Sequence, residues 1–154
     1  MSSWLFTNNP DDYRFIDALN DRVGQIEWLA SRYWKDMLVG DRVFLWQNKG
    51  DQPNNWGIHA VGELISVPRL LSTERFDEYW LSKEAKKLGV RRVRVRLQER
   101  AATGKHLSKR KLEGHPVLST LPNLAFARAT NFKLTDDHVG ALMNEWLPVA
   151  RTYP

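Results

Sequence analysis

The sequence contains no cysteine among its 154 residues. This absence excludes disulfide bonds, thiol nucleophiles and thiolate-bound metal ions together, and it is consistent with a reducing compartment. No apolar stretch approaches the roughly twenty residues that a membrane-spanning helix needs. The segment from Met1 to Trp4 also lacks the basic and then apolar layout of a signal peptide. We therefore expect a soluble, cytoplasmic protein with no membrane partner.

Motifs for metal binding, nucleophilic catalysis and phosphate binding are missing as well. The four histidines are His59, His106, His115 and His138. They show neither HxH nor HExxH spacing, and no nucleophile motif accompanies them. His59 lies among apolar strand residues, so we expect it to pack and not to bind a ligand. Glycine-rich phosphate loops are absent, because Gly57 and Gly62 lie too far apart. The sequence thus predicts no metal, no cofactor and no catalytic site.

Length, charge and tryptophan content indicate the number of domains and the class of partner. A chain of 154 residues is long enough for a proper core, and we expect one domain spanning residues 1–154. The formal net charge of +5 favours polyanionic partners, since clustered lysine and arginine displace counterions from phosphate backbones. The seven tryptophans are many for this length. Such flat rings serve either a core or a binding surface, and composition does not choose between them.

Periodicity and turn residues predict a mixture of strands and helices. Strands are predicted at 3–6, 26–28, 43–46, 56–65, 90–97 and 126–132. Helical segments are predicted after Asn9, after Ser31 as far as Gly40, over 72–88, for one turn within 101–114, and after Thr135. The strands at 43–46 and 56–65 form an antiparallel hairpin around a polar loop. Together these elements indicate an α+β fold, a small mixed sheet curled toward a barrel and flanked by short helices.

Three arginines alternate with apolar residues along the strand at 90–97. The period of two places Arg92, Arg94 and Arg96 on one wet face and the valines on the other. This face either grips phosphates or is a solvated face that limits edge pairing, and the sequence favours neither. Further candidate phosphate contacts are Arg32, Lys35, Lys105, Lys109 and Arg110, of which the first two lie nearest to Trp28.

The aromatic residues are the strongest functional indication in the residues themselves. Reading a base requires holding its ring between flat side chains, with polar groups along its edge. Candidate walls are Trp28, Tyr33, Trp46, Trp56 and Trp80, and candidate edge contacts are Thr7, Asn8, Asn9 and Asn131. Trp4, Trp34 and Trp146 are expected in the core. Trp28 and Trp56 border loops, so we expect them at the surface, where alanine at Trp28 would cost little stability.

Short motifs follow one another along the chain at Trp28–Lys35, Gly40–Trp46, Gly57–Glu63 with Ser66 and Pro68, His115–Leu118, Leu121–Leu124 and Ala129–Phe132. In this order they resemble the EVE domain of the PUA-like superfamily. The resemblance extends from Trp4 to about Trp146 and implies a PUA-like barrel. In EVE domains and the similar YTH readers of methylated adenine, a pocket with aromatic walls takes a modified base, and the turn after the first strand adds polar contacts. Position matching makes Trp28 the best wall and Asn8 the best edge contact. The turn Thr7–Pro10 departs from the serine- and glutamate-bearing turn of many members.

The resemblance therefore implies a binding module and not an enzyme. We expect it to capture a modified base in an aromatic pocket, with DNA carrying modified cytosine or adenine favoured over RNA. EVE domains are often fused to or encoded near restriction and defence nucleases, which implies a partner nuclease. Two alternatives stay open: an RNA-binding PUA-like module, and a small hydrolase or ligand-binding enzyme. A ribose contact would distinguish the first, and a buried carboxylate with a raised pKa would distinguish the second.

Overall fold

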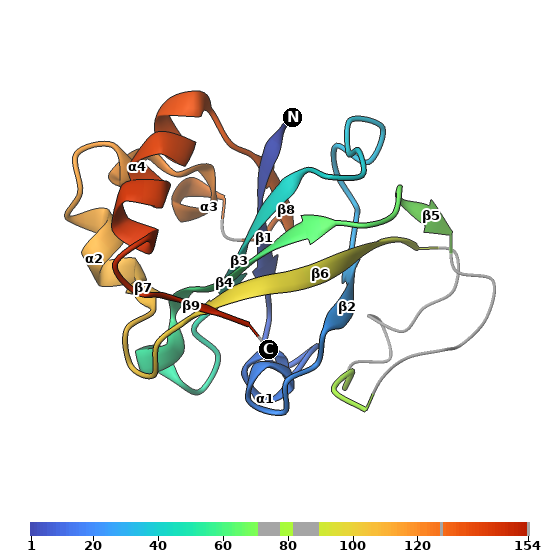
Figure 1. Ribbon diagram of the computed structural model, residues 1–154, viewed down its shortest axis with the longest axis horizontal. Coiled ribbons are helices and arrows are strands. Elements are labelled where there is room, and N and C mark those ends of the chain that lie inside the picture. Colours follow the sequence, from blue (N-terminus) through green and yellow to red (C-terminus); the bar gives the residue numbers. More distant parts are fainter. Residues whose placement is uncertain (71–77, 82–89, 127, 154) are drawn as a thin grey trace.

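One sheet, nine-stranded in the part of the chain that the structure describes, organises the fold (Figure 1). The computed structural model describes residues 1–70, 78–81, 90–126 and 128–153. The strands are β1 (Ser3–Asn8), β2 (Gln25–Leu29), β3 (Arg42–Gln47), β4 (Gly57–Leu64), β5 (Arg69–Leu70), β6 (Arg91–Ala101), β7 (Leu107–Ser108), β8 (Asn131–Lys133) and β9 (Ala150–Thr152). The helices are α1 (Phe15–Asn20), α2 (Lys109–Glu113), α3 (Pro122–Ala125) and α4 (Asp136–Trp146), with 3-10 turns at Pro53–Asn55 and Leu118–Thr120.

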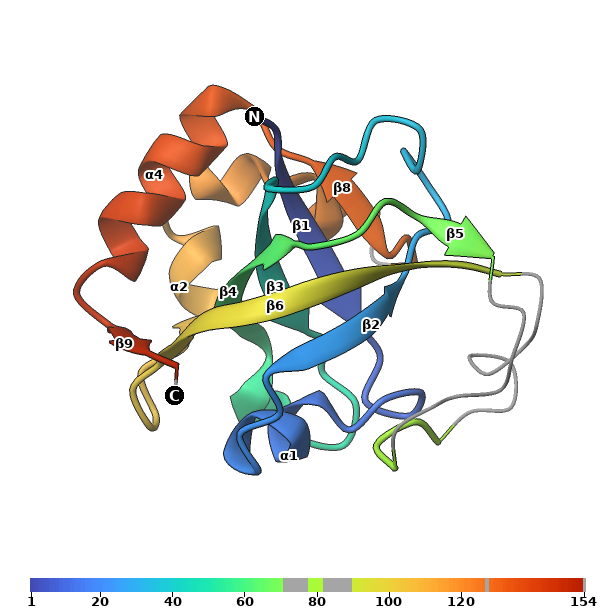
Figure 2. The same ribbon diagram turned by 45° about the vertical axis from the view of Figure 1, so that its right-hand side comes forward.

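The sheet is mixed. Its main path runs in the order β2-β6-β4-β3-β1-β8, and the short strands β5, β7 and β9 pair at its margins. β1 and β3 run parallel, whereas the other strand pairs in the described ranges are antiparallel. Figure 1 shows α2, α3 and α4 together on one side of this sheet, and Figure 2 shows α1 near the end of the strands.

Both faces of the central strands are buried, which explains their nearly continuous apolar runs. In β1, Trp4 and Phe6 belong to one core with α1, β2 and β6, whereas Leu5 between them belongs to a second core under α2 and α4. The Trp28 ring of β2 lies 6.4 Å from the Phe6 ring of β1, centroid to centroid. Since β2 and β1 are four positions apart in the strand order, this contact requires the sheet to curl over the first core.

A buried carboxylate ties the first strand to the turn before β3. Asp41 accepts hydrogen bonds from Trp4 Nε1 at 2.9 Å, from Leu38 N at 3.0 Å and from Ser2 N at 3.2 Å. Its side chain is almost fully shielded from solvent. One acceptor group therefore satisfies three donors from two separate segments.

Replacing Asp41 with alanine should lower the free energy of unfolding by about 1–3 kcal/mol, because buried donors would lose their acceptor. Urea unfolding followed by tryptophan fluorescence measures the change. The exposed Asp36, in the preceding turn, is the matched control, and alanine there should change stability by less than about 0.5 kcal/mol. Equal losses in the two variants would contradict the role given to Asp41.

Most of the predicted strands are confirmed. The first strand continues two residues beyond Phe6, the hairpin of β3 and β4 forms as expected, and β6 includes most of 90–97. Gly40 has a φ of 94°, the left-handed conformation predicted for that corner. Thr135 caps α4 by accepting a hydrogen bond from His138 N at 3.1 Å. Trp4 and Trp146 are fully buried, as expected, and Trp34 packs partly buried against the first core.

Two predicted helical segments need correction, and a third lies mostly outside the described residues. Asn9 caps no helix; its Oδ1 accepts from Asp11 N at 3.0 Å in a turn, and α1 begins only at Phe15. The segment after Ser31 forms turns, since Tyr33 has a φ of 56° that no right-handed helix accommodates. Most of the helix expected at 72–88 lies outside the described residues, and 78–81 form a turn and a bridge to Tyr13.

Two predictions about strands also need correction. β8 begins at Asn131, so only the end of the predicted 126–132 strand forms. Arg92 is 2% exposed, and therefore it does not share a wet face with Arg94 and Arg96. The physical reason is the Trp80 segment, whose indole covers the start of β6 with its centroid 4.6 Å from the Arg92 guanidinium carbon. Within the described residues, no helix has the length and apolarity needed to cross a bilayer.

Candidate nucleic-acid interface

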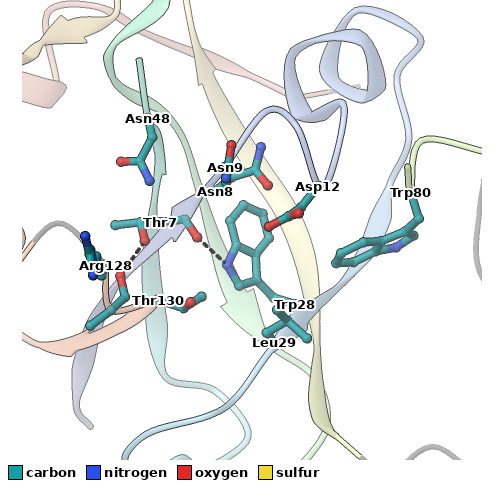
Figure 3. Close-up of a pocket in the computed structure, with 11 residues that line it drawn as sticks. Thr7, Asn8, Asn9, Asp12, Trp28, Leu29, Asn48, Trp80, Arg128 and Thr130 are labelled. Carbon is teal, nitrogen blue, oxygen red and sulfur yellow. Dashed lines mark hydrogen bonds between the residues drawn. The ribbon is translucent and has the colours of Figure 1, made fainter. Parts of the chain in front are cut away.

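A cavity of about 290 Å³ opens where β1 ends, and we call it the Trp28 pocket. It is built from six separate segments of the chain, which Figure 3 shows converging on one indole. Its lining residues are Thr7, Asn8, Asn9, Asp12, Trp28, Leu29, Asn48, Trp80, Arg128, Ala129 and Thr130. Aromatic surface and uncharged polar groups thus meet in one concave site, which is typical of small-ligand pockets.

Trp28 forms a fixed wall of this pocket. Its Nε1 donates to Thr7 O at 3.1 Å, which ties β2 to the end of β1 (Figure 3). Its ring contacts Phe15 edge-on, with centroids 5.4 Å apart, and only 3% of the residue is exposed. The indole is therefore a core residue that presents a small part of its surface to the pocket, which corrects the expectation of a loosely held surface ring.

Polar groups surround the Trp28 ring. The Thr7 hydroxyl donates to Ala129 O at 2.9 Å, and Thr7 N donates to Thr130 O at 2.8 Å, so the 129–130 segment is fixed along β1. Asn8 Nδ2 donates to Tyr13 O at 2.7 Å and to Gln47 Oε1 at 2.9 Å. Because Nδ2 makes both bonds, the acceptor Oδ1 is not used by the Asn8 contacts within the described ranges.

Asp12 and Trp80 lie on the opposite side of the Trp28 pocket from Arg128. In Figure 3 the Asp12 carboxylate lies beside the Trp28 ring, on the side that faces Trp80. Trp80 is 6% exposed and packs against Tyr13 with ring centroids 4.5 Å apart. Arg128 is exposed at the opening. The pocket therefore carries an anionic acceptor inside and a cation at its rim.

The structure brings five of the nine candidate pocket residues together and places the other four elsewhere. Thr7, Asn8, Asn9, Trp28 and Trp80 line the Trp28 pocket. Trp46 and Trp56 line a neighbouring cavity, and Tyr33 lies exposed in the turn after β2.

Asn131 supports the pocket from behind. It is fully buried, and its Oδ1 accepts from Ser31 N at 2.9 Å and Arg32 N at 3.2 Å, while its Nδ2 donates to Leu29 O at 2.8 Å. These bonds fix the chain that follows β2. Asn131 therefore positions Leu29, which lines the pocket, although it does not line the pocket itself.

The candidate phosphate contacts do not form one track. Arg94 pairs with Glu27 at 3.4 Å and Arg96 with Glu63 at 3.0 Å, so carboxylates face both. Surface positions are occupied by Arg32, Lys35, Lys105 and Arg110, whereas Lys109 is half-buried over Trp56. None of the predicted cations lines the Trp28 pocket in the described structure; Arg128 does.

Sequence reasoning missed the residues that long-range folding brings in. Asp12, Leu29, Asn48, Arg128, Ala129 and Thr130 line the pocket without having been singled out. For Ala129 and Thr130 a signal existed, since both lie in the Ala129–Phe132 segment that resembles the EVE domain. Asp12 falls in the helical segment predicted after Asn9, and an acidic residue is ordinary in a first helical turn. Arg128 is one of 23 lysines and arginines, so nothing local marks it.

A curled mixed sheet with short helices on one face and an open pocket at the strand ends defines a PUA-like domain, and solved structures share this fold. The chain belongs to the EVE domain family, whose model matches residues 2–145. No curated protein matches the sequence.

Solved structures of similar fold have low sequence identity to this chain. A hypothetical protein from Leishmania major superposes with a TM-score of 0.67 at 19% identity, covering 94% of this chain and 93% of that one. Human THYN1 in complex with DNA containing 5-methylcytosine gives 0.66 at 15% identity, covering 94% and 96%. The YTH domain of Zygosaccharomyces rouxii MRB1 in complex with N6-methyladenosine RNA gives 0.50 at 11% identity, covering 92% and 85%.

Proposed function

We propose that this chain binds nucleic acid by admitting one modified base into the Trp28 pocket. The observation that carries the proposal is the open cavity of about 290 Å³ in which a fixed indole is surrounded by hydrogen-bonding groups. Stacking on a flat ring and edge contacts to polar groups are the two interactions that hold an extruded base. The complexes of THYN1 and of the YTH domain, each with a methylated base, support this function for the shared fold.

The pocket chemistry suits a base with an exocyclic amine. Asp12 and Asn8 Oδ1 are acceptors, and the amines of cytosine and adenine are donors. Leu29 and Trp80 supply apolar surface on which a methyl group would pack. Such a contact favours the methylated base by roughly 10- to 200-fold at most, the usual limit for one methyl group. Modified cytosine or adenine is therefore the preferred ligand.

Phosphate contacts would come from the rim. Arg128 is exposed beside the pocket opening, and the chain carries a net charge of +5. Backbone contacts of this kind position the strand, whereas the pocket reads the base. The number of cations involved would appear as the slope of affinity against salt.

DNA is the favoured partner, and RNA is the second candidate. The THYN1 complex, with a TM-score of 0.66, contains DNA, while the YTH complex, with a TM-score of 0.50, contains RNA. Binding is favoured over catalysis because the described pocket lining pairs Asp12 with no histidine or cysteine that would act as a base or nucleophile. A partner nuclease stays a prediction, which co-purification from the native host would test.

The test is a titration with matched single-stranded DNA and RNA oligonucleotides that contain 5-methylcytosine, N6-methyladenine or the unmodified base, at several salt concentrations. Tighter binding of one methylated oligonucleotide at every salt concentration is the expected result. A steep salt dependence with equal affinity for all oligonucleotides would reduce the chain to a general polyanion binder and would overturn the proposal.

Replacing Asp12 with alanine should weaken binding of the preferred oligonucleotide by about 1–3 kcal/mol, roughly 5- to 150-fold in Kd, because the base would lose an acceptor. Asp12→Asn keeps an acceptor oxygen and should retain most of the affinity. The control is Asp36→Ala, which removes an exposed carboxylate outside the pocket. If all three variants bind alike, Asp12 does not contact the base.

A further inference from the structure

A second cavity, of about 420 Å³, adjoins the Trp28 pocket. Asn9 and Asn48 line both cavities, so the two side chains form the ridge between them. This ridge is held in place, because Asn48 N donates to Asn8 O at 2.9 Å and Asn48 Oδ1 accepts from Trp46 Nε1 at 3.0 Å. A strand that placed one base in the Trp28 pocket would therefore meet the second cavity on the next step along its backbone.

An indole and a lysine define one side of the second cavity. Trp56 is half-buried, and the Lys109 ammonium lies 4.0 Å from the centroid of its ring. Glu113 pairs with Lys109 at 3.2 Å and holds it there. Lys49 adds an exposed cation to the same lining. Flat aromatic surface beside cations is the arrangement that single-stranded nucleic acid uses, with the base on the ring and the phosphate near the cation.

A buried amide lies in the lining. Asn123 is 5% exposed, and its Oδ1 has no hydrogen-bond partner within the described part of the chain. A buried acceptor in this state is costly, and such groups in folded proteins usually have a partner. The amino group of an incoming base is a suitable donor, and Asp11, which also lines the cavity, is a second acceptor for it.

We propose that this second cavity binds the nucleotide adjacent to the captured base, with its ring against Trp56 and its phosphate at Lys109 and Lys49. The proposal rests on the proposed function, because it needs a neighbouring base in the Trp28 pocket. It gives a role to two residues singled out in the sequence, Trp56 and Lys109, that lie outside that pocket. The chain would then read two successive nucleotides, one by its modification and one by stacking.

The test uses short single-stranded DNA with a central 5-methylcytosine, in which the nucleotide on the 5′ or the 3′ side is replaced by an abasic residue. In the unmodified protein, one of these two replacements should weaken binding about tenfold, since stacking one base on an aromatic side chain contributes about 1–3 kcal/mol. In Trp56→Leu, which keeps apolar bulk but removes the flat ring, the intact and abasic oligonucleotides should bind alike. Trp56→Phe keeps an aromatic ring and should restore part of the difference.

Two outcomes would overturn the second site. In the first, the abasic replacement weakens binding equally in the unmodified protein and in Trp56→Leu. In the second, neither abasic oligonucleotide binds more weakly than the intact one to the unmodified protein. Failure of the proposed function would look different, because it would remove the preference for 5-methylcytosine over cytosine in the unmodified protein. Thermal unfolding of both Trp56 variants checks that they fold.

Discussion

Replacing Trp28 with alanine should lower the free energy of unfolding by about 3–5 kcal/mol, the usual cost of deleting a large buried aromatic side chain. The ring is 3% exposed and contacts Phe6, Tyr13 and Phe15 in the first core. The substitution also removes the hydrogen bond from Nε1 to Thr7 O, which joins β2 to β1. Chemical denaturation measures the loss, and the denaturant concentration at the unfolding midpoint should fall substantially.

Trp56→Ala is the matched control, because that indole is only half-buried and should cost clearly less. Trp28→Phe separates packing from the polar contact, since it keeps a ring in the core but removes the Nε1 donor. A loss below about 1 kcal/mol for Trp28→Ala would show that the ring is dispensable for folding, as the sequence alone had suggested.

Acidification from pH 6.5 to pH 4 should lower the free energy of unfolding, with His59 contributing about 3 kcal/mol of the loss. Burial is the main cause that lowers the pKa of His59 from 6.5 to about 4; its hydrogen bond with Asn55 O opposes the shift, and the charges of His106 and Arg100 add to it. Between these two pH values the unfolded chain binds a proton that the folded chain does not. The contribution of His59 to the free energy of unfolding is therefore present above pH 6.5 and is lost by pH 4.

Local geometry explains why this histidine resists protonation. His59 is the extra residue of a bulge in β4, since Leu45 pairs with Ala60 and Trp46 pairs with Ile58. Its ring stacks on His106 with centroids 4.3 Å apart and planes inclined by 8°, and its Nε2 lies 2.6 Å from Asn55 O. Burial lowers the pKa of His106 as well. Two stacked imidazoles cannot both accept a proton without repulsion.

His59→Phe is the variant that tests this assignment. It keeps a flat ring against His106 but cannot bind a proton, so its unfolding free energy should change less between pH 6.5 and 4. Urea denaturation at several pH values measures both proteins. An unchanged slope in His59→Phe would show that other groups cause the acid sensitivity.

The elements that the sequence predicted well are those whose pattern depends on near neighbours. The alternation in β6, the Gly40 corner and the Thr135 cap are all written in residues a few positions apart. The helix predicted after Asn9 begins only at Phe15, because the Asn9 side chain accepts its hydrogen bond within a turn and does not cap a helix. The prediction of an exposed Arg92 failed because Trp80, twelve positions earlier in the chain, covers its side chain.

The candidate site follows the same division. Thr7, Asn8 and Trp28 were identified from their types and their places near strand ends, and they do line the pocket. Asp12 was not, because it falls in the helical segment predicted after Asn9, and Arg128 was not, because it joins the lining only when the 128–130 segment packs along β1. Trp46 and Trp56, expected beside Trp28, instead line the neighbouring cavity, since they lie on the far side of the Asn9 and Asn48 ridge.

The sequence by itself determined the class of the fold and the family, because hydrophobic alternation, turn residues and short motifs are local patterns that can be recognised without coordinates. Only the tertiary structure decided which aromatic rings face a cavity and which complete the core. That choice depends on the curl of the sheet, which brings β2 over β1 and buries Trp28 to 3% exposure while leaving one surface at the pocket. Contacts between residues far apart in the chain set this curl, and no local pattern encodes them.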